Sequence, residues 1–236
     1  LEIIMKPIEV FIRHCYFSPN TQLENRGRPE WWDMVKTFEN FKKTIDPERA
    51  NYTIVYDEHF GSRDETFLKD ETDVVTINAG CESGSFLKTL ELIESRNLDD
   101  ETIVYFLEDD YLHQPNWCKV LQEAFELPVQ YVSLYDHLDK YMHYPELRSR
   151  IFATDSCHWR TTPSTCNTYA SKMKFLKEDM DIHKGYSIHS NQGVSRDHEK
   201  FVHLERTGRT LITSMPGYST QCDLNPSPTV NWPEYM

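Results

Sequence analysis

One run of five apolar and aromatic residues, Ile103 to Leu107, constrains the fold of this chain more than any other part of its sequence. Because no charged side chain interrupts the run, a strand built from it is buried on both faces, which is typical of the centre of a parallel sheet. On either side of the run, strand-like segments alternate with segments of helical spacing. This β-α-β alternation predicts an α/β fold with a doubly wound, mostly parallel sheet and helices on both faces.

Hydrophobic spacing predicts the individual elements. In the first half we expect strands at 8–13, 52–56, 74–77, 103–107 and 131–135, and helices at 31–45, 86–93 and 115–125. In the less regular second half we expect a strand at 151–154, helices at 168–180 and 196–204, and a last strand at 211–213. Four prolines follow Met215, so we expect an irregular tail that is held by its aromatic side chains.

Composition limits the partners and the cellular location. The 236 residues carry 25 Lys and Arg against 38 Asp and Glu, a formal net charge of −13. Since non-specific binding of nucleic acid needs a basic face, we expect no nucleic-acid partner. No apolar run approaches the ~18 residues of a membrane span, so none is expected. The six cysteines form no C-x-x-C pair, which favours reduced thiols and a cytoplasmic protein.

Three consecutive acidic residues, Glu108, Asp109 and Asp110, follow the apolar run directly. In open parallel sheets, ligands bind outside the carboxyl ends of the strands. Adjacent carboxylates there repel one another unless a cation joins them, and their oxygens suit Mg²⁺ or Mn²⁺. Such a cation can also bridge to a diphosphate. The triplet therefore predicts a divalent metal site, and a solvated acidic turn is the alternative.

Two further polar segments follow expected strands. Asp57 comes after the strand at 52–56, where a carboxylate can accept a hydrogen bond from a base or a ribose. Asn78-Ala79-Gly80 and Ser83-Gly84-Ser85 lie between a strand and a helix, where small residues let backbone N–H groups approach an anion. Neither segment matches the dinucleotide or P-loop pattern. An ordinary polar loop and a capped turn remain the alternatives.

The order of these features resembles that of GT-A glycosyltransferases, especially family 2 and the small bacterial or large-virus type. The matching features are Asp57 after a strand, Asn78-x-Gly80 before a helix, and Phe106 to Asp110 with Pro115 five residues on. The resemblance implies one GT-A domain over residues 1–236. Its nucleotide-sugar-binding half would cover about 8–135, and its acceptor-binding half with the tail about 136–236.

The resemblance also implies roles for single residues. In the family, a D-x-D-like motif holds Mn²⁺ or Mg²⁺ and the donor, so Asp109 and Asp110 would bind the metal, Asp110 most firmly. Glu108 stands at the first acidic position in place of Asp. The donor would be a UDP- or GDP-linked sugar. Its expected contacts are Arg13, Asp57, Gly80, Ser83, Glu108 and Asp109.

The second half is expected to supply the acceptor site and the catalytic base. In inverting enzymes of this fold, a carboxylate near a late helix removes the proton of the acceptor hydroxyl. Asp197-His198-Glu199 opens the helix expected at 196–204. We therefore expect Asp197 to be the base and His198 to be its rival, since a histidine pKa of about 6.5 suits proton transfer. Helix capping is the alternative. Asp136 and the polar segment 158–165 are candidates for the acceptor side.

Together these features predict a metal-dependent, inverting hexosyl- or deoxyhexosyl-transferase of glycan biosynthesis. It would move a sugar from a nucleotide diphosphate to the hydroxyl of a glycan or of a protein-linked acceptor. A nucleotidyltransferase of related fold is the first alternative. A non-catalytic carbohydrate-binding protein, weakly favoured by the 13% of aromatic residues, is the second. The sequence contains neither H-E-x-x-H nor G-x-S-x-G, which argues against a zinc hydrolase and an α/β-hydrolase.

Overall fold

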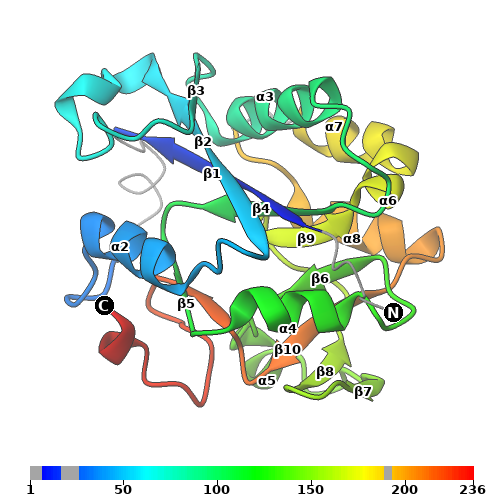
Figure 1. The fold of residues 1–236 in the computed structure, drawn as a ribbon. Helices are drawn as coiled ribbons and strands as arrows, with labels where there is room; N and C mark the ends of the chain where they lie inside the picture. The colour runs from blue at the N-terminus through cyan, green and yellow to red at the C-terminus, as the bar shows by residue number, and fades with distance from the viewer. Residues whose placement is uncertain (1–6, 17–26, 189–192) are drawn as a thin grey trace.

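The computed structural model describes residues 7–16, 27–188 and 193–236, which are built around one large sheet (Figure 1). Its strands are β1 (Ile8–Cys15), β2 (Ala50–Asp57), β3 (Val74–Ile77), β4 (Ile103–Glu108), β6 (Tyr131–Ser133), β7 (Ile151–Ala153), β8 (His158–Thr161), β9 (Tyr169–Lys172) and β10 (Leu211–Met215). A second, two-stranded sheet pairs β5 (Tyr111–His113) with β11 (Ser219–Gln221).

The large sheet has nine strands in the order β3-β2-β1-β4-β9-β6-β10-β8-β7. The first four are mutually parallel. β9 runs antiparallel between β4 and β6, and β8 runs antiparallel between β10 and β7. Since β10 is parallel to β6, seven of the nine strands point in one direction and only β8 and β9 oppose them.

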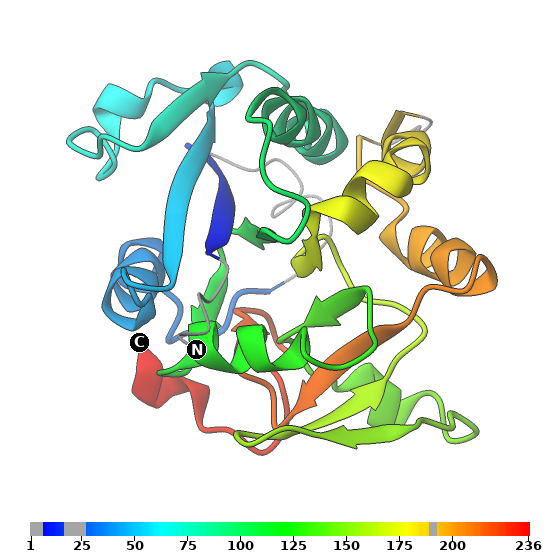
Figure 2. The same ribbon diagram turned by 45° about the vertical axis from the view of Figure 1, so that its right-hand side comes forward.

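Helices cover both faces of this sheet (Figure 1; Figure 2). They are α2 (Met34–Thr44), α3 (Glu82–Ser95), α4 (Trp117–Ala124), α5 (Asp139–Met142), α6 (Met173–Glu178), α7 (Met180–Ile188) and α8 (Asp197–Arg206), with 3₁₀ turns η1 (Glu58–Phe60), η2 (Arg63–Glu65) and η3 (Trp232–Tyr235). α2 and α4 pack on one face, and α3, α6, α7 and α8 pack on the other. The predicted α/β class, with a large mixed sheet and helices on both faces, is confirmed.

β4 shows why the run of apolar residues was informative. Tyr105 and Leu107 enter the core beneath α2 and α4, whereas Val104 and Phe106 enter the core beneath α3 and α6. Because side chains alternate between the faces of a strand, a strand with a core on each side must be apolar throughout. The strand lies at the centre of the sheet, as predicted, but β9 makes one of its two neighbours antiparallel.

The predicted helix at 168–180 is wrong in its first part. Tyr169 to Lys172 forms β9, and only Met173 begins a helix. Tyr169, Ala170 and Ser171 are buried between β4 and β6, with Tyr105 opposite Ala170. The helical spacing of the apolar residues gave the wrong period here because pairing with the open edge of β4 overrides local preference. The strands β5, β8 and β11 were not predicted.

The C-terminal tail is packed, as expected. Its strand β11 pairs with β5, and Trp232 is buried against Leu112 and Cys222. The tail also reaches α2, where the amide of Asn40 donates to the backbone oxygen of Tyr235 at 3.1 Å. Within the described residues, no helix is both long enough and apolar enough to cross a membrane. The six cysteines are all free thiols.

Phe106 offers a test of how strongly the core beneath α3 holds β4. Its ring lies 5.2 Å from that of Phe86 and 4.9 Å from that of Tyr169, centroid to centroid. Phe106→Ala should lower the free energy of unfolding by about 3–5 kcal/mol, because it removes a fully buried ring and leaves a cavity. Urea unfolding followed by circular dichroism measures the loss. The matched change Phe60→Ala, at an exposed ring, should cost less than about 1 kcal/mol.

Candidate functional site

The topology of the sheet singles out the carboxyl ends of β1 and β4. From β1 the chain moves outward to β2 and β3, and then returns to place β4 on the opposite side of β1. Ligands of open α/β sheets bind at such a point of reversal. Arg13 of β1 lies in register with Glu108 of β4, so the predicted acidic triplet leaves the sheet at this point.

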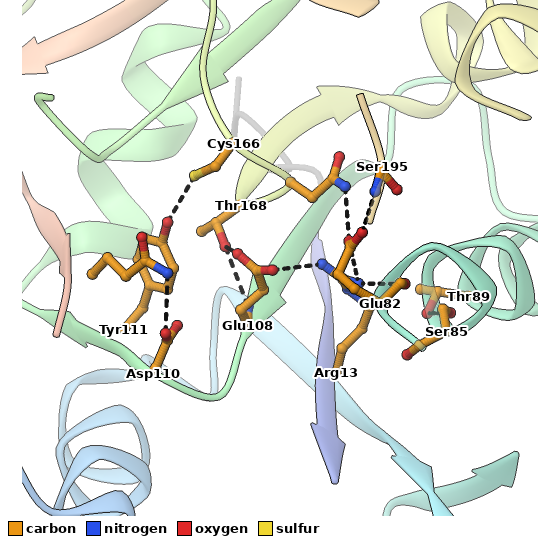
Figure 3. Close-up of polar contacts among 12 residues, drawn as sticks. Arg13, Glu82, Ser85, Thr89, Glu108, Asp110, Tyr111, Cys166, Thr168 and Ser195 are labelled. Carbon is orange, nitrogen blue, oxygen red and sulfur yellow. Dashed lines mark hydrogen bonds and ion pairs between the residues drawn. The ribbon is translucent and has the colours of Figure 1, made fainter. Parts of the chain in front are cut away.

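Arg13 is bound by two carboxylates and is not solvated (Figure 3). Its Nη1 donates to Glu82 Oε1 at 2.7 Å, and its Nη2 donates to Glu108 Oε1 at 2.9 Å. Burial works to lower the pKa of Arg13, but the two carboxylates outweigh it and raise that pKa. Arg13, a predicted donor contact, is therefore a fixed positive charge between the first strand, the central strand and α3.

Glu82 is a central residue of the site that the sequence analysis missed. Besides Arg13, its carboxylate accepts from the Asn167 amide at 2.9 Å and from the Ser195 backbone N–H at 2.6 Å. Burial raises the pKa of Glu82, but the lowering effect of Arg13 and these donors is larger, so the net shift is downward. An acidic residue in the first turn of a helix is an ordinary capping signal. That signal could have found Glu82 but not its partners.

The pKa of Glu108 is shifted upward, towards neutral pH. Burial raises its pKa to about 7, against the lowering effect of Arg13, and Asp110, Glu82 and Asp197 add to the rise. The hydroxyl of Thr168 donates to its Oε2 at 3.2 Å. A carboxyl group that titrates near neutral pH beside other charges is typical of functional sites.

Asp109 faces a buried histidine. Its Oδ2 lies 3.6 Å from His14 Nδ1, and neither ring nitrogen of His14 has a hydrogen-bond partner. Burial raises the pKa of Asp109, and His14 acts to lower it. Burial also lowers the pKa of His14 itself, which favours the neutral ring. Of the predicted metal ligands, Asp109 is the more accessible, because its side chain is only half-buried.

Asp110 lies deeper, where the tail covers the end of β4. It is 5% exposed, and its Oδ2 accepts from Arg28 Nη1 at 2.7 Å and from Gln221 Nε2 at 3.0 Å. Its other oxygen, Oδ1, is buried and has no hydrogen-bond partner. The predicted metal ligand is therefore paired with an arginine through one oxygen and unsatisfied at the other.

Unsatisfied buried polar atoms are concentrated at this end of the sheet. The described residues contain eleven such side-chain atoms, and five of them belong to Arg13, His14, Arg28 and Asp110. Native proteins satisfy nearly all buried polar groups with protein atoms, water or ligands. The concentration therefore marks the end of β1 and β4 as the described region best prepared for a polar ligand.

The described residues fit a divalent metal only in part. Nowhere in the described ranges do three or more His, Cys, Asp or Glu side chains form a group that could hold a metal ion. Mg²⁺ does not need such a cage, because it is often bound by one or two carboxylates together with phosphate oxygens. Asp109 and the unsatisfied Oδ1 of Asp110 are the carboxylates placed for that role. A metal here would need further oxygen ligands from a bound phosphate.

Asp57, Gly80 and Ser83 lie at the same edge and shape the turn before α3. The Asp57 carboxylate accepts from the backbone N–H groups of His59, Ala79 and Gly80 at 2.9–3.2 Å. Gly80 has φ +72°, in the left-handed region that favours glycine, and an added Cβ would lie 3.0 Å from the His59 ring. Ser83 is buried, and its N–H donates to the Gly193 oxygen at 2.9 Å. In the structure Asp57 fixes this turn, and its role toward a donor stays a prediction.

Asp197 and His198, the two predicted catalytic residues, open α8 beside this network. Asp197 is half-buried, and it is close enough to Glu108 to raise the pKa of that carboxyl. Burial raises the pKa of Asp197 as well, whereas the nearby Lys200 lowers it. Asp197 Oδ1 also accepts from the N–H of its neighbour His198 at 2.9 Å, in the first turn of α8, where an acidic side chain favours the helix. His198 is exposed, with its Nδ1 2.9 Å from the Ser164 hydroxyl.

Lys200 is the second residue that the sequence analysis missed. It is 0% exposed, its Nζ donates to Asn167, and it lies 4.7 Å from the ring centre of Phe86 and 4.8 Å from that of Tyr169. Burial lowers its pKa to about 8, against the raising effect of Asp197 and Glu82. A lysine on a charged helix ordinarily faces water, so no local signal distinguished this one.

The candidates for the acceptor side are less available than predicted. Asp136 is buried and accepts from Arg160 Nη2 and from the Tyr141 hydroxyl, each at 2.7 Å. Trp159 is wholly buried in β8, so its ring cannot stack on a sugar. A cavity of about 190 Å³ near the end of β6 is lined in part by His137 and Asp139. A larger cavity of about 520 Å³ is lined in part by Tyr131 and Leu211, at the amino ends of β6 and β10.

The comparisons with known proteins do not assign the chain to a family. No protein-family model matches the chain, and none of the curated proteins does either. The function must therefore be argued from the residues at the ends of β1 and β4 and from their geometry.

Lys200 predicts how the stability of the protein depends on pH. Because its pKa falls from 10.5 to about 8 on folding, the unfolded chain binds more protons between these two values. The free energy of unfolding should therefore rise with pH in this window, by up to about 3 kcal/mol relative to the variant Lys200→Met. Denaturant unfolding at several pH values between 7 and 10.5 measures the difference.

The exposed Lys43 supplies the control for this series. Lys43→Met should show no pH-dependent difference from the wild-type protein. A constant difference between wild type and Lys200→Met across the window would contradict a lysine that loses its proton on folding.

Proposed function

We propose that this protein is a metal-dependent glycosyltransferase of the GT-A fold. It transfers a sugar from a UDP- or GDP-linked donor to a hydroxyl of a glycan or of a protein-linked acceptor. The observation that carries the proposal is the place of Glu108, Asp109 and Asp110. They lie at the reversal point of a mixed α/β sheet, among the largest group of unsatisfied buried polar atoms in the described residues.

The electrostatics of the site suit a phosphate-bearing donor. The chain as a whole carries a net charge of −13, yet the buried Arg13 and the half-buried Arg28 both lie at this end of the sheet. A diphosphate that arrives with a divalent cation adds little net charge to the acidic protein. When bound, the metal would neutralise the charge that develops on the leaving diphosphate. Asp109 and Asp110 would hold it, and Arg28 next to Asp110 would add a second positive charge.

Asp197 is the proposed general base. It opens α8, in the second half of the chain, and lies close enough to Glu108 for its charge to raise the pKa of that carboxyl, so an acceptor bound between the two would be near its carboxylate. Burial raises its pKa, and a higher pKa makes a carboxylate a better proton acceptor. Lys200 keeps the group from being neutralised entirely, since a nearby positive charge favours the ionised form. Inversion at the sugar follows if Asp197 acts on the face opposite the leaving diphosphate.

The first test of this function is binding. Calorimetry should detect a nucleoside diphosphate, UDP or GDP, that binds in the presence of Mn²⁺ and at least about tenfold more weakly in its absence. Asp110→Asn should remove this metal dependence, because it removes a carboxylate that the metal needs. Asp70→Asn, at an exposed position, is the matched control and should bind as the wild type does.

Equal Mn²⁺ dependence in wild type and Asp110→Asn would contradict the proposed site. A protein that instead binds nucleoside triphosphates and releases pyrophosphate would be a nucleotidyltransferase.

The second test concerns Asp197. With a donor that the protein binds, Asp197→Asn should cut turnover by about 10²–10⁴-fold and leave donor affinity nearly unchanged, because only proton transfer is lost. His198→Ala should have a smaller effect. Release of the nucleoside diphosphate in the presence of acceptor measures turnover. Near-normal turnover of Asp197→Asn would make this residue a helix cap and nothing more.

A further inference from the structure

Asp110 forms an ion pair with a positively charged side chain of the protein, that of Arg28. Arg28 Nη1 donates to Asp110 Oδ2 at 2.7 Å and to the backbone oxygen of Cys222 at 2.9 Å. The guanidinium group lies 4.7 Å from the ring centre of Trp32. Because Asp110 is 5% exposed, its charge is poorly screened by solvent and needs such a partner.

This ion pair is incomplete on both sides. Arg28 Nε is buried without an acceptor, and Asp110 Oδ1 is buried without a donor. A structural ion pair in a protein interior normally satisfies its remaining polar atoms, since each one left unpaired is costly. Here a buried N–H and a buried carboxylate oxygen remain open at one place, one suited to an anion and the other to a cation.

We propose that Arg28 is the resident counter-ion of Asp110 and competes with a divalent cation for this carboxylate. A divalent cation on Asp110 Oδ1 would lie within a few ångströms of the guanidinium, and like charges at that distance repel strongly inside a protein. The metal alone therefore binds weakly. It binds well only with a ligand whose phosphate oxygens take up the charge of Arg28. This inference deepens the proposed metal site and rests on it, but its test needs no nucleotide.

The two ligands of the site are thereby coupled. A diphosphate accepts hydrogen bonds from Arg28 and supplies oxygen ligands to the metal, so each ligand removes the obstacle to the other. Coupling of this kind is reciprocal, because a metal that strengthens diphosphate binding must itself be bound more strongly when the diphosphate is present. Arg28 is thus a positioning residue that makes the site respond to the metal and the diphosphate together.

The experiment measures Mn²⁺ binding to the full chain without any nucleotide, by the electron paramagnetic resonance of free Mn²⁺. Arg28→Gln should bind Mn²⁺ at least about tenfold more tightly than the wild type, because the competing charge is gone. Arg28→Lys keeps the charge and should stay within about threefold of the wild type. Arg206→Gln removes one charge from an exposed arginine and is the control for net charge.

The outcomes separate clearly. Unchanged or weaker Mn²⁺ binding in Arg28→Gln overturns the proposal, and so does an Arg28→Lys variant that binds as tightly as Arg28→Gln. Tighter binding in Arg28→Gln that the second change Asp110→Asn abolishes supports it. A protein that shows this pattern but binds no nucleoside diphosphate would refute the proposed function while leaving the competition at Asp110 intact.

Trp32 supplies a readout that does not require Arg28 to be replaced. Since Arg28 lies over the indole ring, its displacement from Asp110 should change the fluorescence of Trp32. Mg²⁺ is the appropriate probe because it does not quench fluorescence itself. A change at high Mg²⁺ that disappears in Trp32→Phe supports the exchange. No Mg²⁺-dependent difference between wild type and Trp32→Phe overturns it, whether or not Arg28→Gln folds.

Discussion

The buried contact of Arg13 with Glu82 and Glu108 is the interaction on which the rest of the site depends. One guanidinium joins the end of β1, the end of β4 and the first turn of α3. Through Glu82 the same network reaches Asn167 and Ser195, in the second half of the chain. Without this positive charge, Glu82 and Glu108 would lose the arginine that pairs with both of them, and burying their charges would be costly. The network therefore joins the two halves of the chain at the candidate site.

The sequence predicted the parts of the fold that depend on local pattern and missed those that depend on pairing at a distance. β4 was predictable because burial on both faces leaves an unbroken apolar run. β9 was not, because Tyr169 and Ala170 are also buried on both faces but precede a true helix with compatible spacing. Only the unpaired edge of β4, more than sixty residues earlier, decides that these residues extend. The GT-A relationship itself remains an inference from the motifs.

The site shows the same division. Asp109, Asp110 and Asp197 could be proposed because they follow a strand or open a helix, which are positions that sequence alone reveals. Lys200 and Arg28 could not, because their importance comes from burial and from partners far along the chain. Glu82 has a helix-opening position that the sequence reveals, but its partners are equally distant. Arg28, for example, lies 82 residues from Asp110. Nothing near Lys200 in the sequence indicates that it is wholly enclosed by aromatic rings and an amide.

The tail that covers the end of β4 has a consequence for biosynthesis. Gln221 contacts Asp110, Cys222 supplies the oxygen that accepts from Arg28, and β11 holds both in place by pairing with β5. The ribosome adds these residues after every strand of the large sheet. A nascent chain can therefore assemble its sheet while the carboxylate at its centre still lacks its final neighbours. The final surroundings of Asp110 are thus supplied by residues that are synthesised after the strands of the sheet that carries it.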